Sequence, residues 1–235
     1  MEYLYNNDCF MLMKTFIEKG LKVDLILTDP PYEVSVTNGG GSVNNVKKFK
    51  QTLTDINSKN IDKGYEIETF GDLVVQLMNN INIYFWCNKI QIPRYFDYWV
   101  GKHKCKFDIL VWNKTNALPT YSNKYLTDCE YCLYFRKGGN LCRPQNYEDA
   151  KTIYTAPINH KDKKIYNHPT IKPLDLTEKL VRNSCPEGGL VLDPFMGSGT
   201  TGVACKKNNR NFIGIEIDNY YAKLAWERIN NVESN

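Results

Sequence analysis

The chain has 235 residues, of which 42% are hydrophobic, and its formal net charge is +4; this length suits one large α/β domain, or one domain with a modest insertion. No stretch approaches the roughly 20 consecutive apolar residues of a membrane helix, and the first residues, MEYLYNNDCF, lack the basic and apolar blocks of a secretory signal. Eight cysteines in a chain of this size do not indicate a disulfide framework, so we expect reduced thiols and a cytoplasmic location.

The first two thirds of the chain alternate apolar runs with helical spacings. The elements expected here are strands at 22–29, 81–87, 106–114 and 129–139, and helices at 65–80 and 91–103. Residues 33–64 differ in character, because they are rich in Gly, Asn, Ser and Lys and include three consecutive glycines. Loops of this length in compact domains are often lids or binding loops, so we expect a mobile lid or binding loop here.

The last third of the chain has the clearest pattern. A strand at 189–193 leads into a tight loop at 194–199, a helix begins at Thr200, and another strand covers 211–217. Asp218 then stands where it would cap a final helix. This alternation predicts a doubly wound, mostly parallel α/β sheet, whose ligands bind at the carboxyl ends of the strands.

The sequence LDPFMGSGTT places glycines where a ligand would approach the backbone. Gly197 and Gly199 flank Ser198 just before a helix, whose first N–H groups favour an anionic ligand. The next strand ends in Glu216, where an acid would bind ribose hydroxyls. This order favours a nucleoside cofactor over a glycine turn beside a surface acid. Because GSGTTG continues to Gly202, spacing does not exclude a dinucleotide, whereas the missing G-K-[ST] excludes a P-loop.

Five motifs in one order resemble a known family. They are NNDC (6–9), DPPY (29–32), DILVWNK (108–114), NHPTIKP (167–173) and DPFMGSGTT (193–201). Together they resemble the amino-methyltransferases that transfer a methyl group from S-adenosylmethionine to exocyclic amines of DNA bases. DPPY precedes the glycine loop, as in the beta group of these enzymes. The resemblance spans most of the chain and implies a Rossmann-like sheet of the methyltransferase type with a small inserted recognition segment.

The resemblance also implies how the ends of the cofactor would be bound. Asp8 and the Cys9 backbone would meet the adenine, and Glu216 would take the ribose hydroxyls. Thr170 and Lys172 would bind near the carboxylate, because a hydroxyl and a cation suit an anion.

The glycine loop would bind the rest of the cofactor. Phe195 would lie against it, with Gly197 and Ser198 along its methionine portion. The cofactor-binding residues that we expect are Asp8, Cys9, Thr170, Lys172, Asp193, Phe195, Gly197, Ser198, Gly199, Thr200 and Glu216.

DPPY would supply the chemistry. The amino nitrogen of adenine is a poor nucleophile, because its lone pair is delocalised into the ring. The Asp29 carboxylate and the Pro30 carbonyl would accept its two N–H bonds, and the prolines hold that carbonyl in place. Tyr32 would stack on a base flipped out of the duplex, a contact worth roughly 1–3 kcal/mol. Asp29, Pro30, Pro31 and Tyr32 are therefore the expected catalytic residues, and a type I turn after a strand is the alternative.

Positive charge gathers in the middle of the chain. Residues 101–172 carry 13 Lys and Arg against 6 Asp and Glu, and the rest carries 17 against 20. A basic middle suits double-stranded DNA, although a solvated lysine-rich face would have the same composition. We expect target recognition in 115–166, between a catalytic half at 1–114 and an S-adenosylmethionine-binding half at 167–235 of one structural domain.

The loop at 33–64 is a second candidate for DNA contact. Lys47, Lys48 and Lys50 stand beside Phe49, a basic stretch with an aromatic residue, and would contact the phosphates. The resemblance also allows a homodimer and a companion restriction endonuclease, as in related systems, and it requires no metal.

In the family that the motifs resemble, aspartate at the first position of DPPY favours adenine N6 as the target. We therefore expect site-specific methylation of a flipped adenine in DNA. Three alternatives stay open: a cytosine-N4 enzyme, an RNA-directed enzyme, and an inactive nucleic-acid-binding descendant. A zinc site at Cys129, Cys132 and Cys142 with His160 is disfavoured, because the alternation in CEYCLYF is typical of an ordinary strand.

Overall fold

The computed structural model describes residues 2–32, 65–119, 123–139, 141–158, 165–166 and 171–232. Several expected features lie outside these residues. They are the 33–64 loop with Lys47, Lys48 and Lys50, Thr170 of the NHPTIKP motif, and His160.

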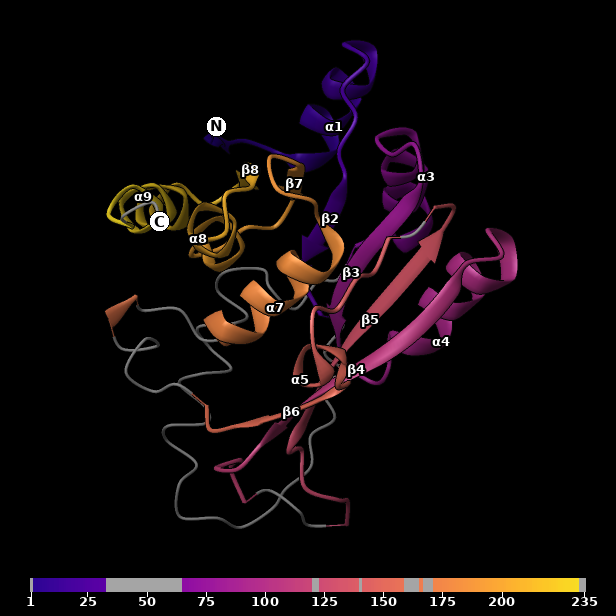
Figure 1. Cartoon of the computed structure of the whole chain (residues 1–235), viewed down its shortest axis with the longest axis vertical. Helices are drawn as coiled ribbons and strands as arrows, with labels where there is room; N and C mark the ends of the chain where they lie inside the picture. Colours follow the sequence, from indigo (N-terminus) through magenta and orange to yellow (C-terminus); the bar gives the residue numbers. More distant parts are fainter. Residues whose placement is uncertain are drawn as a thin grey trace.

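Eight strands of the described residues form one sheet in the order β1-β8-β7-β2-β3-β5-β4-β6 (Figure 1). The strands are β1 (Glu2–Asn6), β2 (Leu25–Thr28), β3 (Ile81–Cys87), β4 (Lys106–Lys114), β5 (Cys129–Lys137), β6 (Ile153–Ala156), β7 (Leu190–Asp193) and β8 (Asn211–Glu216). β5 runs antiparallel to β3 and β4, and the other neighbouring pairs of these strands are parallel. The predicted doubly wound, mostly parallel sheet is confirmed.

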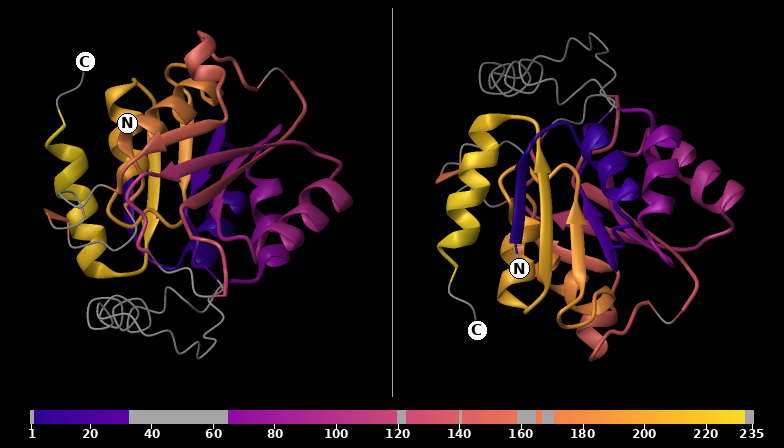
Figure 2. Two further views of the ribbon diagram at one scale, coloured as in Figure 1. Left: turned by 90° about the horizontal axis from the view of Figure 1, so that it is seen from below. Right: turned by 90° about the horizontal axis from the view of Figure 1, so that it is seen from above.

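Helices cover both faces of the sheet. Figure 2 shows the indigo-to-magenta helices of the first half on one face and the orange-to-yellow helices of the last third on the other. The first group is α1 (Cys9–Glu18), α3 (Ile67–Gln76), α4 (Ile92–Phe96) and the π-helix η1 (Asp97–Lys102). The second group is α7 (Leu174–Ser184), α8 (Thr200–Lys207) and α9 (Asn219–Asn230), and a short helix, α5 (Tyr147–Ala150), precedes β6.

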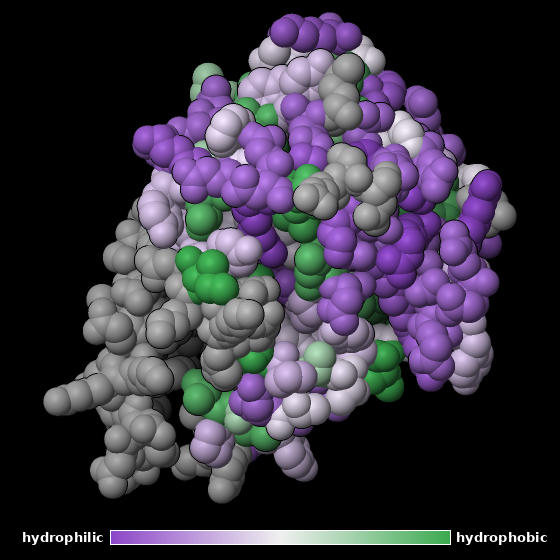
Figure 3. Space-filling view, turned by 60° about the vertical axis from the view of Figure 1, so that its left-hand side comes forward, coloured by the Kyte–Doolittle hydropathy of each residue, from purple (hydrophilic) through white to green (hydrophobic). Residues whose placement is uncertain are grey.

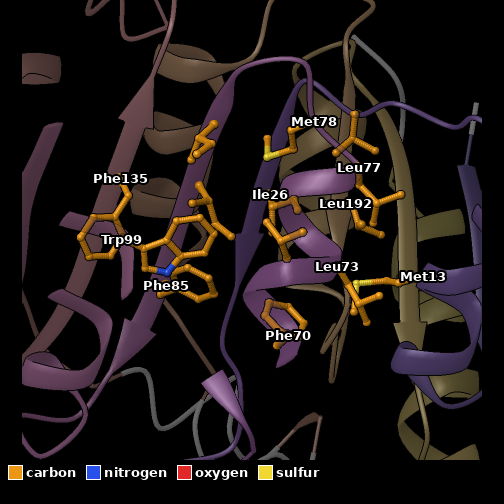
Figure 4. Packing of buried hydrophobic residues seen from close by; sticks show 14 of the residues in the cluster. Met13, Ile26, Phe70, Leu73, Leu77, Met78, Phe85, Trp99, Phe135 and Leu192 are labelled. Carbon is orange, nitrogen blue, oxygen red and sulfur yellow. The ribbon is translucent and has the colours of Figure 1, made fainter. Parts of the chain in front are cut away.

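The core consists of two layers, because successive side chains of a strand point to opposite faces. In β3, Ile83 and Phe85 join the cluster under α1, α3 and η1, where Trp99 is fully buried (Figure 4). Tyr84 and Trp86 join the cluster under α7, α8 and α9. β3 is therefore buried on both faces, which explains its continuous apolar sequence INIYFWC.

Several elements match their sequence-based bounds closely. β3 and β4 span the residues predicted for them, and Asp218 caps α9 by accepting hydrogen bonds from the N–H groups of Tyr220 and Tyr221. The helix expected at 91–103 is present, but its second half is η1, a π-helix. The sequence patterns do not predict β1, α1, α5, β6 or α7.

Strand order determines where the functional loops meet. β2 and β7 are parallel neighbours in the middle of the sheet, with β3 on the far side of β2 and β8 on the far side of β7. The chain therefore leaves β2 and β7 toward opposite sides, which makes this a topological switch point. DPPY follows β2 and DPFMGSG follows β7, so both motifs lie at the carboxyl edge at this switch point.

The segment 115–166, expected to be an inserted recognition unit, is partly built into the sheet. β5 lies between β3 and β4, and β6 pairs with β4. A purely inserted role therefore applies at most to the connections around these strands.

Polar residues cover much of the face seen in Figure 3, with hydrophobic residues in separate patches. No helix within the described ranges is long and apolar enough to span a membrane.

Candidate active site

The first half of the site is the turn that follows β2. The Tyr32 hydroxyl donates a 2.7 Å hydrogen bond to Oδ1 of Asp29, so the turn closes on its own first residue. At the end of β2, the Thr28 hydroxyl donates a 2.7 Å bond to Oδ1 of Asp193 at the end of β7. This buried bond joins the two motifs, which are separated by more than 160 residues in sequence.

A buried side chain from the connection between β3 and α4 holds the prolines of DPPY. Pro30 is buried and Pro31 is half-buried. Gln91, which is 1% exposed, donates from Nε2 to the Pro31 carbonyl at 3.3 Å. This bond occupies the Pro31 carbonyl and fixes the turn from the β3 side, and the acceptor role of the Pro30 carbonyl stays a prediction.

Lys172 lies at Asp29. Its ammonium group forms an ion pair with Oδ2 of Asp29 and a second one, at 3.3 Å, with Oε2 of Glu130. Glu130 also pairs with Lys114 at the end of β4, at 2.5 Å. The resemblance implies that Lys172 lies near the cofactor carboxylate, whereas the structure pairs it with Asp29, the expected catalytic acid, and with Glu130, which the sequence patterns do not single out.

The pKa values at this cluster reflect burial and the pairing. Burial raises the pKa of Asp29, and Lys172 acts against that rise. Burial also acts to raise the pKa of Glu130, but Lys172 and Lys114 outweigh it, so this pKa lies below its ordinary value. For Lys172, burial lowers the pKa and the two acids more than compensate. The result is a charged ammonium group held between two acids.

The glycine loop takes a conformation that requires its glycines. Gly197 has φ 50° and Gly199 has φ 81°, both in the left-handed region that other residues rarely adopt. Gly199 is the N-cap of α8, and a Cβ atom there would lie 3.0 Å from Cβ of Ala225 in α9. Gly199 is thus needed for close packing of α9 against the start of α8.

A buried arginine fixes the hydroxyl groups of this loop. Arg228 of α9 donates to the Ser198 carbonyl at 3.1 Å, to Oγ of Ser198 at 3.3 Å and to Oγ1 of Thr200 at 3.0 Å. Both hydroxyl-bearing residues are themselves buried. Their predicted contact with the cofactor stays a prediction, and their first structural role is to connect the loop to α9.

Glu216 is fixed by two backbone groups at the end of β8. Its Oε2 accepts the N–H of Gly197 at 2.9 Å, and its Oε1 accepts the N–H of Asp218 at 2.8 Å. A carboxylate offers about four lone-pair positions, so two remain for the hydroxyl groups of a ribose. Burial raises the pKa of Glu216, and these two N–H groups act in the opposite direction.

The two N-terminal predictions lie beside β8. Asp8 is the N-cap of α1, and its Oδ1 accepts the N–H of Met11 at 3.0 Å. Cys9 is buried in the first turn of α1, and burial raises the pKa of its thiol to about 12. β1 pairs with β8 up to Asn6 and Glu216, so NNDC and the predicted ribose-binding acid lie at the same edge of the sheet.

Phe195 connects the glycine loop to the opposite helical layer. Its ring lies 5.5 Å from Phe70 of α3 and 5.6 Å from Tyr65, measured between centroids. The Tyr65 hydroxyl is 2.5 Å from that of Tyr95. Phe195 thus joins an aromatic group that closes the space between the glycine loop and α3.

Asp193 is a buried acid in the centre of the site. It accepts the Thr28 hydroxyl and the Phe195 N–H at Oδ1, and the Thr201 hydroxyl at Oδ2, at 2.7, 3.1 and 2.7 Å. Burial raises its pKa to about 7, although these hydrogen bonds lower it. Its observed contacts are therefore with the protein, and they hold the two motifs together.

The three cysteines of the disfavoured zinc site do not form a metal-binding cluster. Cys132 is buried in the core while Cys129 and Cys142 are half-buried, and all three are free thiols. The described residues contain no group of three or more His, Cys, Asp or Glu that could hold a metal ion.

The residues that sequence reasoning missed have different signals. Glu130 is an acid inside an otherwise apolar strand, CEYCLYF, and Lys114 ends the strand motif DILVWNK. A charge within a buried strand is uncommon and indicates a buried partner. Nothing in the local sequence marks Gln91 or Arg228, whose partners lie 60 and 30 residues away in the chain.

Comparison with known proteins places this geometry in a family. Residues 23–227 match the model of a DNA methylase family, N6_N4_Mtase. The chain is 31% identical to the type II methyltransferase M2.LlaDCHI of Lactococcus lactis subsp. cremoris, covering 97% of this chain and 88% of that protein. It is also 31% identical to the type II methyltransferase M2.DpnII of Streptococcus pneumoniae, with 96% and 88% covered.

Solved structures of other proteins have a similar fold. The structure of M1.HpyAVI in complex with SAM superposes with a TM-score of 0.73 at 29% identity, covering 97% of this chain and all of that one. PvuII DNA methyltransferase, described as cytosine-N4-specific, has a TM-score of 0.68 at 16% identity over 99% and 90% of the chains, which shows the fold alone. The sheet, the paired motifs at its carboxyl edge and the match over most of the sequence establish that the chain belongs to the N6/N4 DNA methylase family.

Proposed function

We propose that the protein transfers a methyl group from S-adenosylmethionine to the N6 amino group of an adenine flipped out of double-stranded DNA. The observation that carries this proposal is the geometry at the end of β2. Asp29 is fixed there by Tyr32 and Lys172, beside the glycine loop that follows β7.

The chain's own groups act on the nucleophile. Asp29 accepts one N–H of the target amino group and the Pro30 carbonyl accepts the other, which favours a pyramidal nitrogen with an available lone pair. Because Gln91 and the two prolines hold the turn, these acceptors are oriented before the base arrives. The amino nitrogen would bond to the methyl carbon while the electron pair of the carbon–sulfur bond stays on sulfur, and the surplus proton would pass from the nitrogen to the Asp29 carboxylate.

The residues at the ends of β7 and β8 suit the cofactor. S-adenosylmethionine supplies a methyl group activated by its sulfonium centre. Glu216 has two lone-pair positions free for the ribose hydroxyls, and Gly197 presents a positive-φ backbone next to it. Asp8 and Cys9, at the same edge, would meet the adenine, Phe195 would lie against the cofactor, and Gly197 and Ser198 would line its methionine portion.

Adenine is proposed over cytosine because the tetrad begins with aspartate. The two bases present the same pairing pattern, an amino group beside a ring nitrogen, so Asp29 and Pro30 fit either one chemically. Target choice must then come from the shape of the base pocket and from DNA contacts. We propose that Lys47, Lys48 and Lys50, with the connections around β5, make those contacts. A cytoplasmic location, a homodimer and a companion restriction endonuclease stay predictions.

The test is methyl transfer to mixed substrates. Purified protein is incubated with labelled S-adenosylmethionine and a mixture of unmethylated double-stranded DNA and RNA, and the digested nucleosides are identified by mass spectrometry. N6-methyladenine is the expected product. N4-methylcytosine would show that the base assignment is wrong, and methylation of RNA alone would show that the nucleic acid is wrong. No transfer, with DNA binding retained, would indicate an inactive descendant.

The Asp29→Ala variant tests the assigned chemistry. We expect methyl transfer to be abolished while affinity for S-adenosylmethionine, measured by calorimetry, stays unchanged, because Asp29 faces the target amino group. Asp97→Ala is the matched control, since Asp97 is an exposed acid at the start of η1. Full activity in Asp29→Ala would refute the role of Asp29.

A further inference from the structure

Four charged side chains of alternating sign form a continuous chain at the carboxyl edge of the sheet. In order, they are Lys114, Glu130, Lys172 and Asp29. We call this set the charge chain. Its members come from the end of β4, the start of β5, the segment before α7 and the turn after β2. Segments that are far apart in the chain therefore combine to build it.

The members of the charge chain are largely removed from water. The Lys172 side chain is 6% exposed, and that of Glu130 is 19% exposed. Buried ion pairs seldom add stability, because the loss of hydration offsets the attraction. A role in function therefore explains these two acids and two lysines better than stability does. One of the acids, Asp29, is the proposed catalytic acid.

Aromatic rings fix the ammonium group of Lys172. It lies 5.2 Å from the centroid of the Trp86 ring and 5.5 Å from that of Tyr32. Cations are attracted to aromatic faces at such distances. With Asp29 and Glu130 on its other sides, Lys172 has little freedom to turn toward a different anion.

We propose that Lys172 is a positioning residue that keeps the Asp29 carboxylate ionised and oriented toward the target amino group, and that Glu130 in turn positions Lys172. Lys172 supplies the positive charge that a buried carboxylate needs, and Glu130 compensates the buried lysine. One oxygen of Asp29 is held by Tyr32 and the other by Lys172, and the remaining lone pairs accept the amino N–H. This inference rests on the proposed function and gives Lys172 a role at the target base instead of at the cofactor.

The titratable groups facing Asp29 come from every element around it. They are Tyr32 in its own turn, Lys172 before α7, Glu130 and Cys132 in β5, Cys87 in β3, Tyr95 in α4 and Asp193 in β7. Among these, Lys172 lowers the pKa of Asp29 and Glu130 raises it. Removing Lys172 should therefore raise the pKa of Asp29, and removing Glu130 should lower it.

The experiment compares Lys172→Met, Glu130→Gln and wild type by the pH dependence of kcat for DNA methylation. In Lys172→Met, we expect the acid limb to move to higher pH and kcat at neutral pH to fall about 100-fold. In Glu130→Gln, we expect the acid limb to move to lower pH. Affinity for S-adenosylmethionine, measured by calorimetry, should stay within about twofold of wild type in both.

Lys102→Met is the control, because Lys102 pairs with Asp72 on the exposed surface of η1 and α3, at 2.7 Å. Its pH profile should match wild type. Acid limbs that stay in place, or that move in the same direction in both variants, would overturn the inference, as would loss of cofactor affinity in Lys172→Met. If Lys172→Met does not fold, Glu130→Gln decides alone. Wild-type protein without methyl transfer would instead refute the proposed function.

Discussion

Asp193 links the two halves of the active site, and its buried carboxyl group should make the stability of the protein depend on pH. It is 4% exposed, and burial raises its pKa from 3.8 to about 7. We predict that Asp193→Asn removes this dependence. Asparagine has the same shape, and its carbonyl oxygen can still accept from Thr28 and from the Phe195 N–H.

The sign and size follow from linkage between proton binding and folding. The folded-state pKa lies above the unfolded value, so the folded protein binds this proton more tightly. The stabilisation is complete below pH 3.8 and is lost as the pH rises through about 7. A rise of about three pKa units, at about 1.4 kcal/mol each, corresponds to about 4 kcal/mol.

The assay is urea unfolding of wild type and Asp193→Asn, followed by tryptophan fluorescence from pH 4 to pH 8. Other titrating groups are common to both proteins and cancel in the difference. The free energy of unfolding of wild type should fall by about 4 kcal/mol relative to the variant across this range. A difference that stays constant with pH would show that Asp193 ionises normally and that our account of its burial is wrong.

Two further predictions concern the helices and the cofactor. Gly202→Ala should lower the free energy of unfolding by about 1–3 kcal/mol, because the added Cβ would lie 2.3 Å from Cδ1 of Ile229 and 2.7 Å from the Phe212 ring; an unchanged urea midpoint would contradict this packing. Glu216→Gln should weaken S-adenosylmethionine binding about 10- to 100-fold, since a hydrogen bond to a charged group is worth about 1.5–3 kcal/mol. Calorimetry measures this affinity, and wild-type binding would exclude Glu216 from the ribose site.

Local sequence was enough to locate most elements near the site. The apolar run INIYFWC predicts β3, and Asp218 caps α9 as its side chain and position indicate. DPPY and DPFMGSG follow strands, and parallel strands end at a common edge. Their meeting at that edge could therefore be predicted without coordinates.

Other features of the fold cannot be predicted from the local sequence. β1 and β6 are short edge strands with weak patterns, and their pairing with β8 and β4 involves residues far away in the chain. The antiparallel insertion of β5 between β3 and β4 is a matter of strand order, which periodicity does not encode. The recognition role expected for 115–166 stays a prediction, and β5 and β6 within this segment belong to the sheet.

The family, the motifs and the edge of the sheet where the motifs act can all be predicted from the sequence. The contacts of Lys172 with Asp29 and Glu130 cannot, because they depend on how the segment before α7, the turn after β2 and the start of β5 pack around one point. A motif specifies which residue types are present in a segment and how they are spaced. The partner of a buried charge is set by the strands and loops that enclose it, since burial forces each charge to find its opposite within a few ångströms.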